Sequence, residues 1–580
     1  MTVSGRAGLA VLLLTMCLVG AVFQPFGRAE TPGSPDLAYT MTVNSAAASK
    51  HIVHISISIP NAYSSSLTLG PHPFFFADEV SAAMSTRILN LTATDEKGEI
   101  LSIHKSGASS WAISPKTAGQ VNVEYEIAMN ITEPTGSGGY LNYLGEEFGL
   151  SVAAWVFLVP LNLGVHSISI RFSLPDGWSS HAPWDSSATG YISDSLAYFA
   201  TSTFAVGRFE LFSRVIGNTN VSIAAYAGWP EQTRNEMAAY SFGAFEYIAN
   251  VFRASVVPRH LCIYVPRISN EQNLAMEWSQ SQGVFVYSND PMSAVVGFSH
   301  RVFHIYNAFP PAGMRIKGEV EEWTKEGINT YYQMDKCLRT IGLLKQHEIL
   351  LDDYRTYQTS YLGTSNDRPV AAAETEDLIK NWDVHYFIVF RKASLVSFTL
   401  DETISKLTAD KSLDDVLAYM YQKYGCFKSP RPYWPFGIYS SAGYSNEDLL
   451  HALNLVTGYD FKPFFQKYVS GRDKLPLRIV SGDLDVDWPE LLQAMKLMSV
   501  ILTTTAAIVS ATSATETVTS EMSTSLTPPQ TTTVSESETT RMASVQLMTG
   551  ILTTDVLVIL GLTVVVLAVV GVFVLRRRGK

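Results

Sequence analysis

Two histidines stand four residues apart in the segment 299–307, which reads SHRVFHIYN. On a helix, this spacing puts the imidazoles of His300 and His304 on one face, where they can share a metal ion. A chance pair of surface or core histidines has the same spacing, so the pair alone does not establish a site. A carboxylate from a second helix would complete a His/His/Glu zinc site with one position left for water.

Such a carboxylate is offered by the segment 322–327, EWTKEG. The same region fits an ordinary solvated acidic face, because Glu319, Glu321 and Glu322 crowd it. Taken by themselves, the residues leave both interpretations open.

Two longer motifs resemble those of the glycyl aminopeptidase-like metallopeptidases, a family with the gluzincin fold that is related to thermolysin and the larger zinc aminopeptidases. The segment 300–307, HRVFHIYN, is similar to the family's H-E-x-F-H-x-W-N. The segment 323–332, WTKEGINTYY, is similar to its W-x-x-E-G-x-x-x-Y-Y. The resemblance implies a zinc ion held by His300, His304 and Glu326.

Three further segments carry the resemblance. The segment 274–279, LAMEWS, is similar to the family's G-G-L-E-H, in which the Glu meets the amino terminus of the substrate. Glu277 inherits that role by resemblance. The segments 411–416 and 456–469 also look like family segments, so the resemblance spans roughly residues 40–477.

Two catalytic positions of the family are changed in this chain. In these enzymes a Glu follows the first His, takes a proton from the zinc-bound water and passes it to the leaving amine. Here that residue is Arg301, whose guanidinium has no lone pair to accept a proton. In the segment 389–395, Phe390 stands where the family's Y-x-K-G has a Tyr whose hydroxyl stabilises the oxyanion. Loss of one oxyanion donor typically lowers the rate about a hundredfold to a thousandfold.

These departures leave three hypotheses. The chain is a catalytically silent or strongly altered member of the fold that binds a peptide or another ligand at the cell surface. Alternatively, it is an active zinc aminopeptidase in which another carboxylate, from Glu277 or Glu322, acts as the base. The third hypothesis is a structural cell-surface protein whose site is a relic.

Charge and cysteine content argue against a nucleic-acid-binding protein and against a small disulfide-rich fold. The chain has 42 basic and 53 acidic residues, and no basic block precedes its extreme C-terminus, so we do not expect nucleic acid as a partner. One of its four cysteines, Cys17, lies in a predicted signal peptide. Cys262, Cys337 and Cys426 remain, which excludes a small fold stabilised by several disulfides.

The two ends of the sequence predict a membrane-anchored, exported protein. Residues 1–29 are typical of a signal peptide, with an uncleaved N-terminal anchor as the alternative. Residues 556–575 are uncharged and long enough to span a bilayer as a helix. The basic tail 576–580 then lies in the cytoplasm and the large N-terminal part outside. On such a glycoprotein three sequons would be usable, at Asn90, Asn130 and Asn220.

The hydrophobic pattern predicts a β-rich domain at the N-terminus. Short alternating runs recur over residues 36–230, for example at 51–59, 120–127 and 166–172. Many short strands without a strong helical period indicate an all-β, sandwich-like domain.

Helical spacing begins after this region and continues over residues 231–477. The segment 445–454 is one example, with Ser445 as its N-cap. This region is predicted to be α-rich with some strands, and the resemblance identifies it with the thermolysin-like gluzincin domain. Residues 478–502 connect it to a stalk rich in Ser and Thr over residues 503–554.

Overall fold

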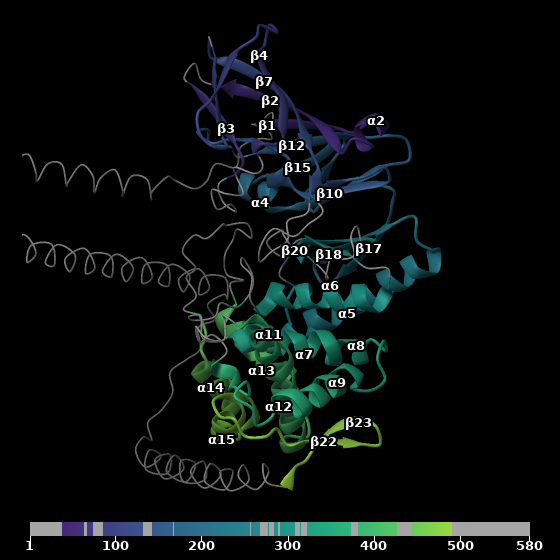
Figure 1. Ribbon diagram of the computed structural model, residues 1–580, viewed down its shortest axis with the longest axis vertical. Helices are drawn as coiled ribbons and strands as arrows, with labels where there is room; N and C mark the ends of the chain where they lie inside the picture. The colour runs from purple at the N-terminus through teal and green to yellow at the C-terminus, as the bar shows by residue number, and fades with distance from the viewer. Residues whose placement is uncertain are drawn as a thin grey trace, which may run out of the picture. The chain divides into compact units, whose positions relative to one another are not determined.

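The computed structural model of the chain describes two regions rich in regular secondary structure (Figure 1). Within the described residues, no helix has both the length and the apolar composition needed to cross a bilayer. The predicted signal peptide, stalk, membrane span and basic tail lie outside them, as does Cys426. The described residues are 37–62, 66–72, 85–115, 117–131, 142–165, 167–255, 257–266, 276–277, 283–287, 290–307, 314, 322–372, 381–425 and 443–489.

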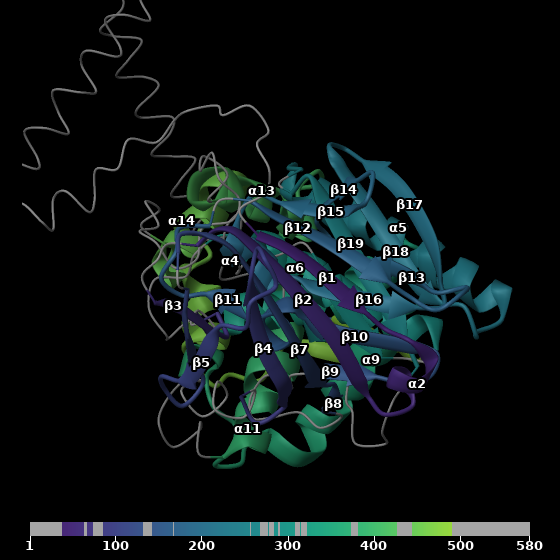
Figure 2. The same ribbon diagram turned by 90° about the horizontal axis from the view of Figure 1, so that it is seen from above.

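A seven-stranded sheet forms the largest layer of the first region, in the order β14-β15-β12-β1-β2-β7-β4 (Figure 2). Alternation builds it: along β2, Val53, Ile55, Ile57 and Ile59 are buried while their neighbours are partly exposed. β1 runs parallel to β12, and the other pairs are antiparallel. The strands are β1 (Leu37–Thr42), β2 (Ile52–Ala62), β4 (Ile88–Asp95), β7 (Gly119–Ala128), β12 (Ile168–Ser173), β14 (Asp185–Ser187) and β15 (Gly190–Ser193).

Two smaller sheets and three short helices complete this region, which confirms the predicted β-rich domain. Their side chains join those of the large sheet in one core that includes Trp155, Trp184 and Phe199. The five-stranded sheet has the order β13 (Ser179–His181), β16 (Thr203–Gly207), β10 (Phe148–Val152), β9 (Asn142–Leu144) and β8 (Asn130–Ile131). The four-stranded sheet has the order β11 (Val159–Pro160), β3 (Leu67–Gly70), β6 (Trp111–Ser114) and β5 (Ser102–Lys105), and the helices are α2 (Ser45–Ala48), η2 (Ala153–Trp155) and α4 (Leu196–Thr201).

The second region begins earlier than the predicted boundary at residue 230. Strands β17 and β18 form a hairpin, and β18 pairs in parallel with β19 of the second region. Alternation predicts that a segment is a strand but does not identify its partner, so the sequence does not reveal that β17 and β18 join this sheet. The sheet has the order β17 (Phe209–Ile216), β18 (Thr219–Tyr226), β19 (Arg259–Val265), β21 (Gly283–Tyr287) and β20 (Met276–Glu277).

Helices dominate the rest of this region, as predicted, and pack around its own core. The predicted cap at Ser445 is confirmed, because its hydroxyl accepts from the Asp448 backbone N–H and the Asp448 carboxylate accepts from the Ser445 N–H. The helices are α5 (Glu231–Phe252), α6 (Pro291–Asn307), α7 (Ile328–Tyr331), α8 (Cys337–Thr340), α9 (Glu348–Thr356), α11 (Trp382–Tyr386), α12 (Ala393–Leu407), α13 (Leu413–Tyr424), α14 (Asn446–Thr457) and α15 (Lys462–Phe464). Wider π-helical turns are η3 (Trp323–Gly327), η4 (Tyr332–Lys336), η5 (Tyr357–Tyr361), η7 (Phe387–Lys392) and η8 (Phe465–Val469), with a 3₁₀ turn η6 (Val370–Ala372) and a hairpin of β22 (Leu477–Val480) and β23 (Asp483–Val486).

Candidate metal centre

Helix α6 carries both histidines on its buried face. It packs against α5 and β21, and its apolar residues from Ala294 to Tyr306 are buried in the core of the second region. His304 is 1% exposed and His300 is partly buried. Their Nε2 atoms lie 3.0 Å apart, so the four-residue spacing brings the two imidazoles together as predicted.

Glu326 reaches the same point from the π-helical turn η3. Its Oε2 lies 3.2 Å from Nε2 of His304 and 3.6 Å from Nε2 of His300, and its side chain is buried. Within the described part of the chain, these residues are the one group of three or more His, Cys, Asp or Glu side chains close enough to hold a metal ion.

The donor set fits zinc. Ligand bonds of about 2.0–2.2 Å in a tetrahedral site place neighbouring ligand atoms about 3.4 Å apart, and the three separations here, 3.0, 3.2 and 3.6 Å, bracket that value. Two imidazole lone pairs directed at each other repel unless a proton or a cation lies between them. A zinc ion held by His300, His304 and Glu326 therefore satisfies this geometry.

Two amide side chains fix the orientation of the imidazoles. Nδ1 of His300 lies 2.7 Å from Oε1 of Gln333, and Nδ1 of His304 lies 3.0 Å from Oδ1 of Asn307. Because an amide oxygen only accepts, each Nδ1–H donates, which leaves the Nε2 lone pair for a metal. Asn307 is held in turn, since its Nδ2 donates to the backbone oxygen of Lys325 at 2.8 Å.

The surroundings of the cluster favour the metal-binding protonation states of His300 and Glu326. Burial lowers the pKa of His300 well below its ordinary value, and the charges of His304 and Arg301 lower it further, against the opposing effect of Glu326. Burial alone would raise the pKa of Glu326, but His304, Lys325 and His300 together hold that pKa well below its usual range. A neutral His300 and an ionised Glu326 are the forms that coordinate zinc.

The turn that carries Glu326 depends on a close helix approach. Gly327 lies against Ala393. A Cβ atom added to Gly327 would lie only 3.1 Å from the backbone oxygen of Val389. A side chain at Gly327 has no room there, because η3 and η7 pack directly on each other. Glycine at this position therefore allows η3 to present Glu326 to the histidines.

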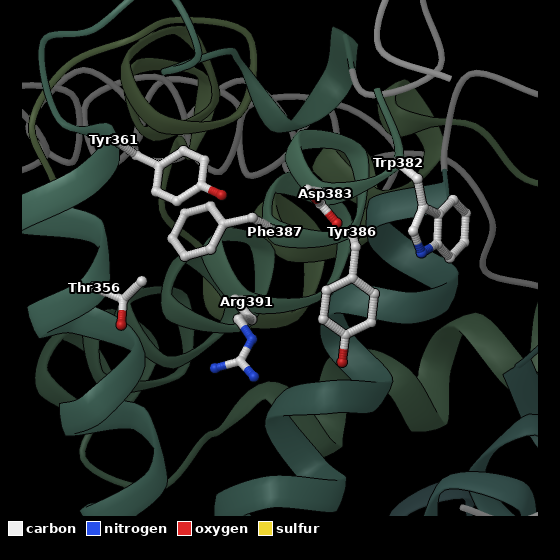
Figure 3. Close-up of a pocket in the computed structure, with 7 residues that line it drawn as sticks. All are labelled: Thr356, Tyr361, Trp382, Asp383, Tyr386, Phe387 and Arg391. Carbon is white, nitrogen blue, oxygen red and sulfur yellow. The ribbon is translucent and has the colours of Figure 1, made fainter. Parts of the chain in front are cut away.

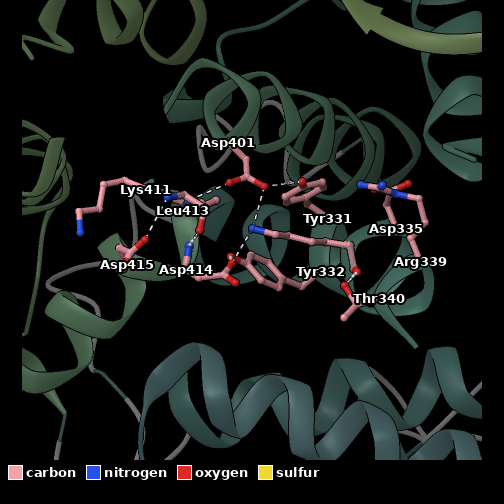
Figure 4. Close-up of polar contacts among 12 residues, drawn as sticks. Tyr331, Tyr332, Asp335, Arg339, Thr340, Asp401, Lys411, Leu413, Asp414 and Asp415 are labelled. Carbon is pink, nitrogen blue, oxygen red and sulfur yellow. Dashed lines mark hydrogen bonds and ion pairs between the residues drawn. The ribbon is translucent and has the colours of Figure 1, made fainter. Parts of the chain in front are cut away.

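A buried polar network holds the helical segment that follows Glu326 (Figure 4). Nζ of Lys336 lies 2.8 Å from Oδ2 of Asp401 and 2.6 Å from Oδ1 of Asp414. Tyr331 donates to Asp401 at 2.7 Å, and Tyr332 donates to Asp414. Burial opposes the charge on Lys336, but the two carboxylates outweigh it and raise its pKa. Sequence reasoning missed this network because its members lie on α7, η4, α12 and α13, which span more than eighty residues of the chain.

Arg301 and Phe390, the residues that the resemblance predicts at two altered catalytic positions, lie on α6 and η7. Arg301 is half-buried on α6 directly after His300, and no carboxylate stands at that position. Phe390 lies on η7, and its ring stacks on Tyr386 with centroids 4.8 Å apart. A phenylalanine ring has no hydroxyl to donate, so the aromatic position is kept without its hydrogen-bond donor.

A second polar pair, which the sequence analysis did not identify, lies one helical turn from Glu326. Oε2 of Glu322 lies 3.4 Å from Nε2 of His385, a buried residue of α11. Residues four apart share one helix face, so Glu322 and Glu326 project from the same side. No motif or spacing in the sequence marks His385 as a candidate site residue. Its pairing with Glu322 in the structure identifies it.

A cavity of about 370 Å³ opens beside η7 (Figure 3). Its walls are aromatic, and the rings of Tyr361 and Phe387 stack in parallel with centroids 3.6 Å apart. The lining residues are Thr356, Tyr361, Trp382, Asp383, Tyr386, Phe387 and Arg391. None of the predicted ligand residues is among them, although Trp382 packs against His385 and Tyr386 packs against Phe390.

Glu277 lies on β20, the edge strand of the sheet of the second region, where it pairs with Val284 of β21. Its contact with the amino terminus of a substrate stays a prediction. The roles of His300, His304 and Glu326 as ligands also stay predictions, although the structure brings these three side chains together.

Comparison with known proteins supports the resemblance. Residues 40–207, which end with β16, match the family model described as the peptidase M61 N-terminal domain. A solved aminopeptidase N family protein from Idiomarina loihiensis is 15% identical with a TM-score of 0.54, and the alignment covers 76% of each chain. A substrate-bound M1 zinc metallopeptidase from Deinococcus radiodurans is 13% identical with a TM-score of 0.42, over 76% of this chain and 94% of that one. The likeness to the Idiomarina loihiensis protein shows the fold. No curated protein matches the chain.

Proposed function

We propose that this chain, a gluzincin-like protein with a peptidase M61 N-terminal domain, holds zinc and binds a peptide-class ligand while its hydrolytic activity is lost or strongly altered. The observation that supports this most directly is the clustering of His300, His304 and Glu326, while Arg301 and Phe390 stand at the two positions that the resemblance identifies as catalytic. The metal ligands are thus present, whereas the groups needed for catalysis are not. Binding and turnover are expected to separate in the same way.

The ligands are prepared for zinc by the rest of the chain. Gln333 and Asn307 orient the two imidazoles, and Lys325 engages Oε1 of Glu326 at 3.0 Å, which leaves Oε2 for the metal. When bound, zinc would supply Lewis-acid polarisation of a ligand carbonyl or carboxylate oxygen. These contacts explain how a site without catalysis still retains affinity for metal.

Hydrolysis lacks two contributions from this chain. A general base must accept a proton within hydrogen-bond reach, and the guanidinium of Arg301 cannot accept one. An oxyanion donor must present an N–H or O–H group, and Phe390 presents neither. The two losses remove different contributions to the rate, proton transfer and stabilisation of the oxyanion.

A restoration series tests this proposal. Arg301→Glu, Phe390→Tyr and the double variant of the full chain are assayed for zinc content and for turnover of small aminoacyl substrates. We expect zinc in the natural chain without turnover, and turnover appearing in the double variant. Chelator-sensitive cleavage by the natural chain, with no gain from Arg301→Glu, would overturn the silent-site proposal. Absence of zinc from every variant would favour a structural protein with a relic site.

The pair of Glu322 and His385 favours one alternative, an active zinc aminopeptidase with a displaced base. An imidazole oriented by a carboxylate is an effective proton acceptor, and this pair lies one turn from Glu326. Under this alternative the natural chain cleaves aminoacyl substrates, and both Glu322→Gln and His385→Asn reduce turnover with zinc content unchanged. Unchanged turnover in both variants would exclude the pair as the base.

The proposal places this site outside the cell. Residues 556–575 would anchor the chain in the membrane as one helix, the stalk 503–554 would hold the folded regions away from the bilayer, and the partner would be a peptide or protein at the cell surface. Protease added to intact cells is expected to remove the folded regions and leave a small fragment that ends in the 576–580 tail. Protection of the folded regions would reverse the orientation.

A further inference from the structure

The cavity beside η7 has an exposed aromatic wall on α11 (Figure 3). Trp382 and Tyr386 stand four residues apart, so their rings project from one side of the helix, with centroids 6.4 Å apart. Trp382 is 63% exposed, although tryptophan is on average a highly buried residue. Aromatic faces that remain open in this way attract cations as well as apolar groups.

A carboxylate stands on the same wall. Asp383 follows Trp382 and lines the cavity, and its side chain is exposed. It forms no ion pair with any residue that the structure describes. Burial raises the pKa of Tyr361, which lines the cavity from η5, and the charge of Asp383 raises that pKa further against the opposing effect of Arg391. The charge of Asp383 therefore acts inside the cavity.

The cation of the lining already has an anionic partner. Among the described residues that line the cavity, Arg391 alone is basic. Its Nη1 lies 2.5 Å from Oδ1 of Asp353, whose side chain is buried. Because this pair balances its own charge, Asp383 gives the cavity a net negative charge. Such a cavity attracts a cation and repels an anion.

The Arg391 pair also indicates which cation suits these walls. Its guanidinium meets a carboxylate and an aromatic ring together, since Cζ of Arg391 lies 5.9 Å from the ring centroid of Tyr386. Trp382 and Asp383 offer the same two partners to a guanidinium from another molecule. A guanidinium stacks on aromatic faces and pairs with a carboxylate through a planar fork of N–H donors, whereas an ammonium is a compact point charge.

We propose that this cavity binds the guanidinium of an arginine side chain in a peptide, with its plane on Trp382 and its N–H groups on Asp383. The cavity volume of about 370 Å³ lies in the range of about 300–1,000 Å³ that is typical of small-ligand pockets. None of the predicted metal ligands lines the cavity, so this site is separate from the metal centre and does not depend on zinc.

Three capped tripeptides test the proposal on the purified full chain by isothermal titration calorimetry. N-acetyl-alanyl-arginyl-alaninamide carries the guanidinium, its citrulline analogue has nearly the same shape without the charge, and its lysine analogue carries an ammonium. We expect the arginine peptide to bind about tenfold or more tightly than the citrulline peptide, and also more tightly than the lysine peptide. Equal affinities for the arginine and citrulline peptides would overturn the proposal. A lysine peptide that binds as tightly as the arginine peptide would overturn the assignment to a guanidinium.

Variants of the exposed wall give the matched controls. Asp383→Asn is expected to abolish the preference for arginine over citrulline, and Trp382→Leu to weaken binding of the arginine peptide about fivefold or more. Asp473→Asn removes an exposed carboxylate outside the cavity and is expected to leave the preference intact. Circular dichroism checks that each variant folds, and Asp383→Glu, which keeps the charge, is expected to keep the preference. A preference that survives Asp383→Asn would overturn the proposal.

Chelation separates this site from the metal centre. Affinity for the arginine peptide is expected to be the same before and after treatment with a chelator and dialysis, whether or not the natural chain holds zinc. Loss of that affinity on chelation would place the peptide at the metal centre and overturn the separate site. Absence of zinc from the natural chain would overturn the proposed function and leave this inference standing.

Discussion

Gly327 of the π-helical turn η3 lies in direct contact with Ala393, the first residue of α12, and a Cβ on Gly327 would overlap the Cβ of Ala393. We therefore expect Gly327→Ala to lower the free energy of unfolding by about 1–3 kcal/mol, because a packed core does not accommodate an added methyl without shifting. The shift displaces the adjacent Glu326, so zinc affinity falls as well. Chemical denaturation and zinc titration measure the two effects.

The same contact supplies its own rescue experiment. Ala393→Gly removes the nearest obstructing atom, so the double variant is expected to recover part of both stability and zinc affinity. Recovery remains partial because the backbone oxygen of Val389 still lies 3.1 Å from the added Cβ. Strict additivity of the two single variants would show that this contact does not position η3.

Gln333 is predicted to support zinc binding without touching the metal. Its Oε1 accepts from Nδ1 of His300 at 2.7 Å, so Gln333→Leu releases the ring and its tautomer. We expect zinc affinity to fall about tenfold to a hundredfold, as for other residues that orient a metal-ligating histidine. Gln232→Leu is the matched control, because the exposed Gln232 bonds only Glu236 in the described structure. Equal zinc affinity for the two variants would contradict the orienting role.

Local spacing made the pairing of two of the three ligand candidates predictable. The four-residue interval between His300 and His304 specifies one helix face, and the cap at Ser445 depends on residues three positions away. Both features arise within one turn of helix, so they are visible in the sequence.

Tertiary contacts account for what sequence reasoning did not find. The contact of Gly327 with Ala393 and the pairing of Glu322 with His385 join helices that are distant along the chain. Assignment of β17 and β18 to the second region depends on their pairing with β19, which periodicity does not encode. Such features follow from packing between elements and need the structure.

Lys336 is expected to contribute strongly to stability. It pairs with the buried Asp401 and the partly buried Asp414, so Lys336→Met leaves both carboxylates without their cation. Breaking a buried ion pair by removing one partner costs about 3–5 kcal/mol. The exposed pair of Arg478 and Asp485 offers a control, because Arg478→Met removes an ion pair of the kind worth about 0–1 kcal/mol. Urea denaturation yielding similar losses for both variants would contradict the structural role of the network.

The first region is predicted to lose stability in mild acid. Burial lowers the pKa of His181 from 6.5 to about 4, so the unfolded chain takes up a proton at higher pH than the folded one. Stability from this residue is complete above about pH 6.5 and falls as the pH drops toward 4, by on the order of 3 kcal/mol.

Urea denaturation between pH 7 and pH 4.5 measures this loss. His181→Gln is expected to reduce the pH dependence by about half. The substitution does not abolish the pH dependence, because burial also lowers the pKa of His72 to about 4. An unaltered pH dependence in His181→Gln would show that the buried imidazole is not its source.

Zinc stoichiometry of the purified full chain, measured by mass spectrometry of the metal after exhaustive dialysis, tests the central claim most directly. The cluster of His300, His304 and Glu326 predicts one zinc ion for each chain, and loss of that ion in His304→Ala. A natural chain that retains no zinc, or a His304→Ala variant that retains as much as the natural chain, would contradict it.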